Sequence, residues 1–518
     1  MSLEQSTGRL LKQNFASGLV VFLVALPLCL GIALASGAPV LSGILSGVVG
    51  GIVIGLFSTS HISVSGPAAG LAAIVLTAIT ELGAFELFLC AGLIAGGLQL
   101  VLGFLKAGSI TNYIPISVIE GMLAGIGVII ILKQIPYALG SQQLLSIFAE
   151  PILHVHFGSL IVAVISMVIV IGWDFVPQLK RIKILPSALI AVLVGIAVNQ
   201  LFISLNSPLA IPAEQLVQLP VLHDLDDAES LIRFPNFAGL TNPAVWVIGA
   251  TIAVVASIET LLSIEAADRL DTHRRITDTN QELRAQGIGN IVAALIGGLP
   301  ITSVIVRSSA NANAGANHKI STIIHGILLL VCVLSMPALL NEIPLASLAA
   351  ILILIGYKLT RPAIYRHFWQ KGIYQFIPFF ATMVAVVFLD LLKGVGLGLI
   401  ISILFILHGN MKRAYYLSRE ELADADNIVL ELGEEVSFLN KAALKKTLKN
   451  IQPNSKITIN AEKAIYIASD ILELLEDFTN VYAQENNIKV KLKGFKYDYE
   501  NQEGIEHTNV RVEHRRQI

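Results

Sequence analysis

The sequence contains few charged residues for its length. Of its 518 residues, only 14% are Asp, Glu, Lys or Arg, whereas 54% are hydrophobic, and the mean hydropathy is +0.73. Soluble domains carry about 25% charged residues, so this composition predicts a polytopic membrane protein. The net charge of −2 gives no support to a nucleic-acid partner, which an excess of positive charge would indicate.

Cysteines and catalytic motifs are scarce as well. The three cysteines, Cys29, Cys90 and Cys332, lie in apolar stretches, so neither a disulfide framework nor a metal cluster is indicated. The histidines are scattered, and His61 is more typical of a packed or capping residue than of a ligand. Since no catalytic constellation and no Walker motif are present, we expect neither an enzyme nor an ATP-driven machine, and no resident cofactor.

The charges that do occur are concentrated near the C-terminal end. Residues 409–518 hold 16 of the 35 Lys and Arg residues and 18 of the 37 Asp and Glu residues. This distribution predicts a membrane domain over residues 1–410 and a soluble domain over residues 411–518. Apolar stretches in the first domain predict about fourteen membrane segments at ~20 residues for each full span.

Basic residues in alternate loops predict the orientation of the membrane domain. If both termini are cytoplasmic, the inner loops hold most of the basic residues, for example Lys180 to Lys183 and Arg274, while the outer loop at 205–242 is acidic, with Asp224 and Asp226. This loop separates seven segments from seven. Because seven is an odd number, the second half is predicted to be inverted relative to the first.

The stretch from Gly297 to Ser309 contains glycine, proline and one arginine within an apolar region. Irregular backbone at membrane depth occurs only where it is buried in protein or lines a cavity, and an arginine there marks a functional site. We expect an extended segment in which Thr302 or Ser303 caps a half-helix. Because a helix N-terminus and Arg307 both favour negative charge, the stretch predicts an anion site.

A similar stretch, Ser58 to Gly70, lies in the third segment of the first half and leads into a half-helix from Ala68 to about Ile79. Two interrupted segments in corresponding halves are typical of a transporter's binding site, and inversion makes their N-termini converge. A pair of re-entrant turns without a ligand is the alternative. The candidate anion-binding residues are Ser65, Gly66, Ala68, Ala69, Thr302, Ser303, Val306 and Arg307.

The eighth segment carries an acid at membrane depth. Glu259 lies about sixteen residues into its helix, roughly 24 Å from the outer end, and Ser263 lies one turn further on the same face. With Thr302, these residues are candidates for a coupling-ion site that takes a proton or sodium. The alternative is that Glu259 only neutralises Arg307.

Several motifs resemble the SulP family of inorganic anion transporters. They are Ala25–Leu28 with Ala33–Gly37, Val64–Pro67, Gln286–Asn290, and Gly297–Thr302 followed by Arg307 and Ser308. The resemblance implies an α-helical, UraA-like inverted repeat of seven plus seven transmembrane segments with core and gate domains, followed by a small cytoplasmic α/β STAS domain. It also implies a homodimer and secondary active, elevator-like transport of sulfate or bicarbonate.

Two departures from the family pattern bear on the substrate. Leu28 stands where many sulfate-carrying members have Gln, and Val306 stands where many have Ser. Both changes remove hydrogen-bonding capacity, and a tetrahedral dianion needs more donors than bicarbonate does. The pattern therefore favours bicarbonate and leaves sulfate open. Coupling to sodium, to protons or to exchange also stays open, as does an anion channel or a regulated exchanger or sensor using the same site.

The C-terminal domain alternates strands and helices. Strand-like positions at 427–438, 456–460 and 488–492 are separated by helical stretches, which is typical of a small α/β domain. Ser469 is predicted to be a helix N-cap, with a regulatory phosphorylation site as the alternative. The residues after about Phe495 are polar and are predicted to be disordered.

Overall fold

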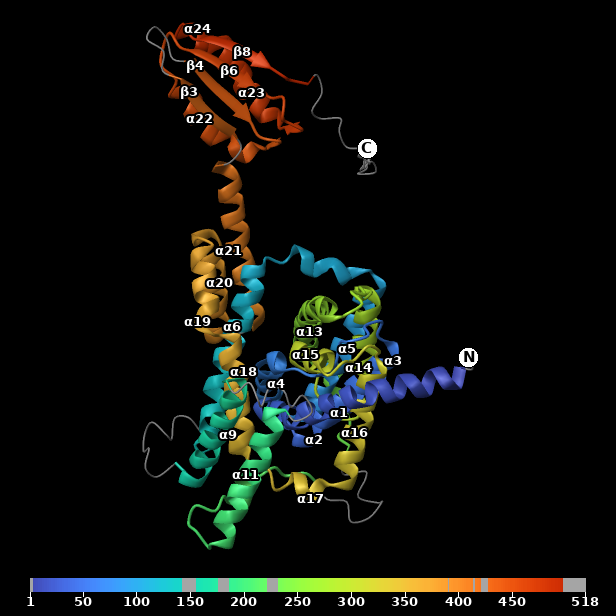
Figure 1. Ribbon diagram of the computed structural model, residues 1–518. Coiled ribbons are helices and arrows are strands. Elements are labelled where there is room, and N and C mark those ends of the chain that lie inside the picture. The colour runs from blue at the N-terminus through green and yellow to red at the C-terminus, as the bar shows by residue number, and fades with distance from the viewer. Residues whose placement is uncertain are drawn as a thin grey trace, which may run out of the picture. The chain divides into compact units, whose positions relative to one another are not determined.

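The structure is a computed structural model that describes residues 3–141, 155–175, 186–220, 232–389, 391–412, 415–420 and 427–496. It contains two compact units, Met1–Leu399 and Ile400–Ile518 (Figure 1). The division falls within one helix, and the limits of 1–410 and 411–518 stay a prediction. Lys180 to Lys183, Asp224, Asp226 and the polar tail from 497 onward lie outside the described residues.

Apolar helices make up nearly all of the first unit. Within the described residues, seven helical stretches are long and apolar enough to cross a membrane, and five apolar helices are shorter. With α14 and α15 they match the predicted fourteen segments. The helices are α1 (Leu3–Ala35), α2 (Val40–Val49), α3 (Gly55–Phe57), α4 (Ala69–Leu82), α5 (Phe85–Phe104), α6 (Ile116–Ala138), α9 (Phe157–Phe175), α11 (Ser187–Ser204), α13 (Pro243–Leu270), α14 (Thr279–Leu295), α15 (Ile305–Asn313), α16 (Ile320–Ser335), α17 (Pro337–Leu340), α18 (Leu345–Leu359), α19 (Pro362–Gln370), α20 (Ile373–Phe388) and α21 (Leu391–Lys412).

These helices pack in two groups. In the first helix group, α5 packs against α13 and α14, and α1 packs against α2, α15 and α16. In the second helix group, α6 packs against α18 and α20, and α9 packs against α11 and α18. Each half of the chain supplies its first four segments to the first group and later segments to the second. This equal division confirms the predicted repeat.

Two short strands pair inside the first helix group. β1 (Ser65–Pro67) pairs antiparallel with β2 (Ile301–Ser303), so that Ser65 lies opposite Ser303 and Pro67 lies opposite Ile301. α4 follows β1 and α15 follows β2. Because the strands run in opposite directions, the two half-helices begin at opposite ends of the strand pair with their N-termini toward it. The predicted convergence of the third and tenth segments is confirmed.

The second unit contains a small α/β domain. Its sheet has the order β3 (Tyr415–Glu420), β4 (Asn427–Leu432), β6 (Lys456–Asn460) and β8 (Lys489–Lys493), and only the β3–β4 pair is antiparallel. Leu430, Ile459 and Ile471 lie in its fully buried core. The further elements are β5 (Glu435–Val436), β7 (Tyr466–Ile467), α22 (Lys441–Lys449), α23 (Ser469–Asp477) and α24 (Ala483–Glu485). This arrangement agrees with the predicted STAS-type fold.

The predicted cap at Ser469 is wrong. α23 begins at Ser469 itself, its N-cap is Ala468, and no side chain caps the helix. Asp470 lies in the first turn, where a carboxylate is favoured by the helix dipole. The first turn is therefore stabilised by charge rather than by a capping hydroxyl.

Candidate functional site

The strand pair is held by backbone and hydroxyl hydrogen bonds between the two halves of the chain. Beyond the paired residues, the Val304 amide donates to the Val64 carbonyl at 2.9 Å, and the hydroxyls of Ser63 and Ser303 lie 2.5 Å apart. The Ser303 amide donates to the Thr260 hydroxyl of α13 at 3.2 Å. These bonds fix the start of α15 against the segment that precedes α4.

The predicted capping of α15 by Thr302 or Ser303 is wrong. The N-cap of α15 is Val304 and that of α4 is Ala68, both extended, and neither helix has a side-chain cap. Ser303 is engaged within the strand pair, while the Thr302 hydroxyl is buried without a hydrogen-bond partner. Both helices therefore begin with backbone N–H groups that no capping side chain satisfies, and such N–H groups attract anions.

Arg307 has no exposed surface and is the largest of the fully buried side chains. Its Nη2 atom lies 3.4 Å from the Pro67 carbonyl oxygen and 3.4 Å from Cys29 Sγ, whereas Nε and Nη1 have no hydrogen-bond partner. No salt bridge to Arg307 occurs among the described residues. A buried cation without a counter-charge is costly, so this position favours an anion nearby.

Gly66 lets the arginine approach the β1 backbone. A Cβ atom built at Gly66 would overlap Nη1 of Arg307, so no other residue fits without displacing the guanidinium group. The position of the Arg307 guanidinium group on α15 therefore requires a residue without a side chain at this point of β1. Of the predicted anion-binding residues, the structure brings this pair into direct contact.

Glu259 lies beside the start of the other half-helix. A Cβ atom built at Gly70, the second residue of α4, would lie 2.7 Å from Glu259 Oε1 and 2.8 Å from Oε2. Oε2 is buried and has no hydrogen-bond partner. The carboxylate therefore faces the N-terminus of α4 rather than Arg307, and the alternative in which it forms an ion pair with that arginine is not supported.

The other predicted site residues are placed as follows. Ser65, Ala68, Thr302 and Ser263 are buried, and Ala69 is partly exposed. Val306 is 48% exposed although it directly precedes the fully buried Arg307. The first turn of α15 therefore exposes an apolar side chain and buries its charge. Ser263 lies one turn beyond Glu259 on α13.

Sequence reasoning missed the support that α14 gives to both strands. The Gln286 side-chain amide donates to the Ser65 hydroxyl of β1 at 2.8 Å. One turn later, the Asn290 amide accepts from the Ile301 N–H of β2 at 2.6 Å and donates to its carbonyl at 3.1 Å. The available signal was the Gln286–Asn290 motif, whose two amides are four residues apart and so share one helix face.

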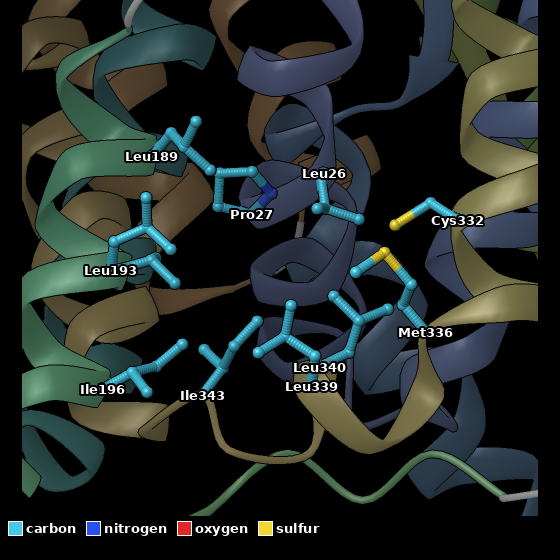
Figure 2. A pocket seen from close by; sticks show the side chains of 11 residues that line it. Leu26, Pro27, Leu189, Leu193, Ile196, Cys332, Met336, Leu339, Leu340 and Ile343 are labelled. Carbon is cyan, nitrogen blue, oxygen red and sulfur yellow. The ribbon is translucent and has the colours of Figure 1, made fainter. Parts of the chain in front are cut away.

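A cavity near the first helix is entirely apolar. It measures about 100 Å³ and lies between α1, α11, α16 and α17, where Pro27 of α1 faces Leu189 and Leu193 of α11 (Figure 2). With no polar side chain in its lining, it cannot hold an anion. It instead separates helices of the first group from α11 of the second group.

Fold and site together define a class of protein. The membrane helices form an inverted repeat, and two short paired strands lie at its centre. The half-helices that follow these strands start beside a buried arginine. This is the arrangement of a carrier for small anions. The model of the sulfate permease family matches residues 11–382 of the chain. The chain belongs to this family of anion transporters.

The relatives are named for different anions. The chain is 29% identical over 420 residues to the putative sulfate transporter YvdB of Bacillus subtilis, covering 79% of this chain and 76% of that protein. It is 26% identical over 446 residues to the bicarbonate transporter BicA of Synechocystis, covering 84% of this chain and 76% of that protein.

Solved structures show the same fold. The transmembrane domain of a cyanobacterial bicarbonate transporter BicA superposes with a TM-score of 0.61 at 25% identity, over 75% of this chain and 98% of that one. The overall structure of SLC26A9 gives a TM-score of 0.72 at 15% identity, over 95% of this chain and 86% of that one. The chain is therefore a polytopic integral membrane protein of this fold.

Proposed function

We propose that this protein is a secondary active carrier that binds bicarbonate or sulfate at the β1–β2 strand pair, between the starts of α4 and α15. The observation that supports this most directly is the fully buried Arg307, which has no carboxylate partner in the described residues. The bound anion is its counter-charge. The two uncapped helix N-termini add a favourable field of ~0.3–2 kcal/mol each.

Arg307→Ala tests this proposal. The variant is expected to abolish anion uptake into proteoliposomes, while size-exclusion profiles show that the fold is intact. Arg284→Ala is the matched control, because Arg284 lies over the Phe104 ring at 4.9 Å and donates to the Gly103 carbonyl, away from the strand pair. Unchanged anion affinity in purified Arg307→Ala would place the site elsewhere.

Bicarbonate is the substrate that we favour. Leu28 is buried and Val306 is exposed beside the arginine, so neither side chain offers a hydrogen bond where a tetrahedral dianion would need one. Similarity to both sulfate and bicarbonate transporters keeps both anions as candidates. Uptake of radiolabelled sulfate and bicarbonate under imposed sodium and proton gradients distinguishes them, and sulfate uptake that exceeds bicarbonate uptake would reverse the preference.

We further propose an elevator-like movement in which the first helix group carries the anion past the second. Every candidate site residue lies in the first group, which supports movement of the site as one body. Glu259, Ser263 and Thr302 are proposed to bind the coupling sodium or proton. An anion channel or regulated exchanger would have little use for the unpaired Glu259 carboxylate. Accumulation of the anion against its electrochemical gradient excludes a channel, since a channel carries its substrate only down that gradient.

The topology that fits this mechanism has both termini in the cytoplasm and two chains in a homodimer. The basic loops around Arg274 and Lys319 support the orientation. Labelling of single cysteines introduced at Arg274 and at Phe237, in the loop that precedes α13, tests it. Reaction of Arg274→Cys with an impermeant reagent in intact cells would contradict this orientation.

A further inference from the structure

A second carboxylate is buried close to the strand pair. Glu282 lies in the first turns of α14 and has no exposed surface. Its Oε2 accepts a hydrogen bond from the Ser58 hydroxyl at 2.5 Å, and its Oε1 accepts one from the Gln286 amide at 3.0 Å. Ser58 precedes β1, and Gln286 also holds β1 through Ser65. Glu282 is thus tied at both oxygens to the segment that forms the anion site.

The charged groups that face Glu282 are engaged elsewhere. Asp268 of α13 accepts from the amide and hydroxyl of Thr277 at 2.8 and 2.6 Å. Lys319, just before α16, donates to the Ser58 carbonyl at 3.0 Å. Among the described residues neither forms a salt bridge with Glu282. Uncharged hydrogen-bond donors therefore hold this carboxylate, and a proton can neutralise it without breaking an ion pair.

The side chain of Gln286 can respond to the protonation state of the Glu282 carboxylate. Its Nε2 donates both to Glu282 and to the Ser65 hydroxyl, while its Oε1 is buried without a partner. Rotation of the side-chain amide by a half-turn about its Cγ–Cδ bond exchanges the positions of Nε2 and Oε1. An ionised Glu282 requires the NH₂ group on its side, whereas a protonated Glu282 offers an O–H and favours the oxygen there. In the second state Oε1 gains two donors, and Nε2 takes the buried position that Oε1 leaves.

We propose that Glu282 is a proton-binding site that sets the anion affinity through Gln286 and Ser65. This inference rests on the proposed function for the role of Ser65. With Glu282 ionised, the Ser65 hydroxyl accepts from Gln286, so its own hydrogen is free to bind the anion. With Glu282 protonated, Ser65 donates to the turned amide oxygen instead. The proton comes from water at the exposed start of α14, where Asp278 is the N-cap residue one turn before Glu282.

Anion binding is therefore expected to weaken as the pH falls. We predict that KM, expressed as the concentration of sulfate or bicarbonate ion actually present at each pH, rises about tenfold or more in wild-type protein between about pH 8 and pH 5, the loss of one hydrogen bond to a charged group. Glu282→Gln resembles the protonated state, so it should show the high KM at every pH. Glu265→Gln is the matched control, because it removes an exposed carboxylate paired with Arg269 on α13. A wild-type pH dependence that survives in Glu282→Gln would overturn the proposal.

Infrared difference spectroscopy supplies a readout that does not need transport. Acidification of the Glu259→Gln protein, which lacks the other buried carboxyl of the site, should produce a protonated-carboxyl band that is absent once Glu282 is also replaced by Gln and retained when Glu265 is replaced instead. Gln286→Leu should keep this band but lose the pH dependence of KM. If the wild-type protein transports neither anion, the proposed function fails, whereas the infrared band still decides the proton site. Absence of the band in Glu259→Gln, or its persistence when Glu282 is also replaced by Gln, would overturn the inference.

Discussion

Adding one methyl group at Gly66 should weaken anion binding without removing or adding any charge. The Cβ atom of Gly66→Ala would overlap Nη1 of Arg307, and the arginine is fully buried, so its guanidinium group has little free space to move into. Overpacking of this kind costs about 1–3 kcal/mol. If overpacking destabilises the anion-bound state by this amount, the anion affinity should drop about fivefold to a hundredfold or more, at a factor of ten for each 1.4 kcal/mol.

The assay is the concentration dependence of anion uptake into proteoliposomes, with KM and the maximal rate reported separately. Gly97→Ala is the matched control, because a Cβ atom at Gly97 on α5 meets nothing within 4 Å. That variant should behave as wild type. A wild-type KM in Gly66→Ala, at equal thermal stability of the two variants, would show that the position of the guanidinium group does not matter for anion binding and would refute the reasoning.

Two further predictions follow from the titratable groups. Glu259→Gln should abolish the dependence of uptake on a sodium or proton gradient while anion-for-anion counterflow continues; gradient dependence that persists in the variant would end the coupling role. In the loop after α13, the hydrogen bond from Arg275, at 2.6 Å, holds the pKa of Asp271 at about 2. The folded pKa is lowered, so this contribution of about 2 kcal/mol is present above ~pH 4 and lost as the pH falls through about 2. Asp271→Asn should therefore lower Tm at neutral pH, and an unchanged Tm would count against the bond.

The outline of the site could be predicted from the sequence because its signals are local. Glycine and proline next to Thr302 mark irregular backbone, and a single arginine at membrane depth marks function. Counting segments then placed the two interrupted helices in corresponding positions. No knowledge of tertiary contacts was needed for these steps, and the extended segments and the half-helices appear where they were expected, although their pairing as strands was not predicted.

The details could not be predicted because they depend on residues far apart in the chain. The capping prediction failed since Ser303 is held by Ser63, 240 positions away, rather than by its own helix. Glu282 reads as an ordinary acid near a helix start, and only its contact with Ser58, 224 positions away, shows that it is buried and bound. The direction of Glu259 toward Gly70 has the same origin.

The antiparallel pairing of β1 with β2 also has a consequence for biosynthesis. Ser63 and Ser303 are separated by 240 positions, so the first strand emerges from the ribosome long before its partner exists. At about 5–20 residues per second, this delay lasts roughly 10–50 s. Throughout that time the hydroxyls of Ser63 and Ser65 lack their partners Ser303 and Gln286. The anion site is therefore completed only after most of the membrane unit has been synthesised, and a nascent chain halted before β2 exposes this polar segment to the insertion machinery.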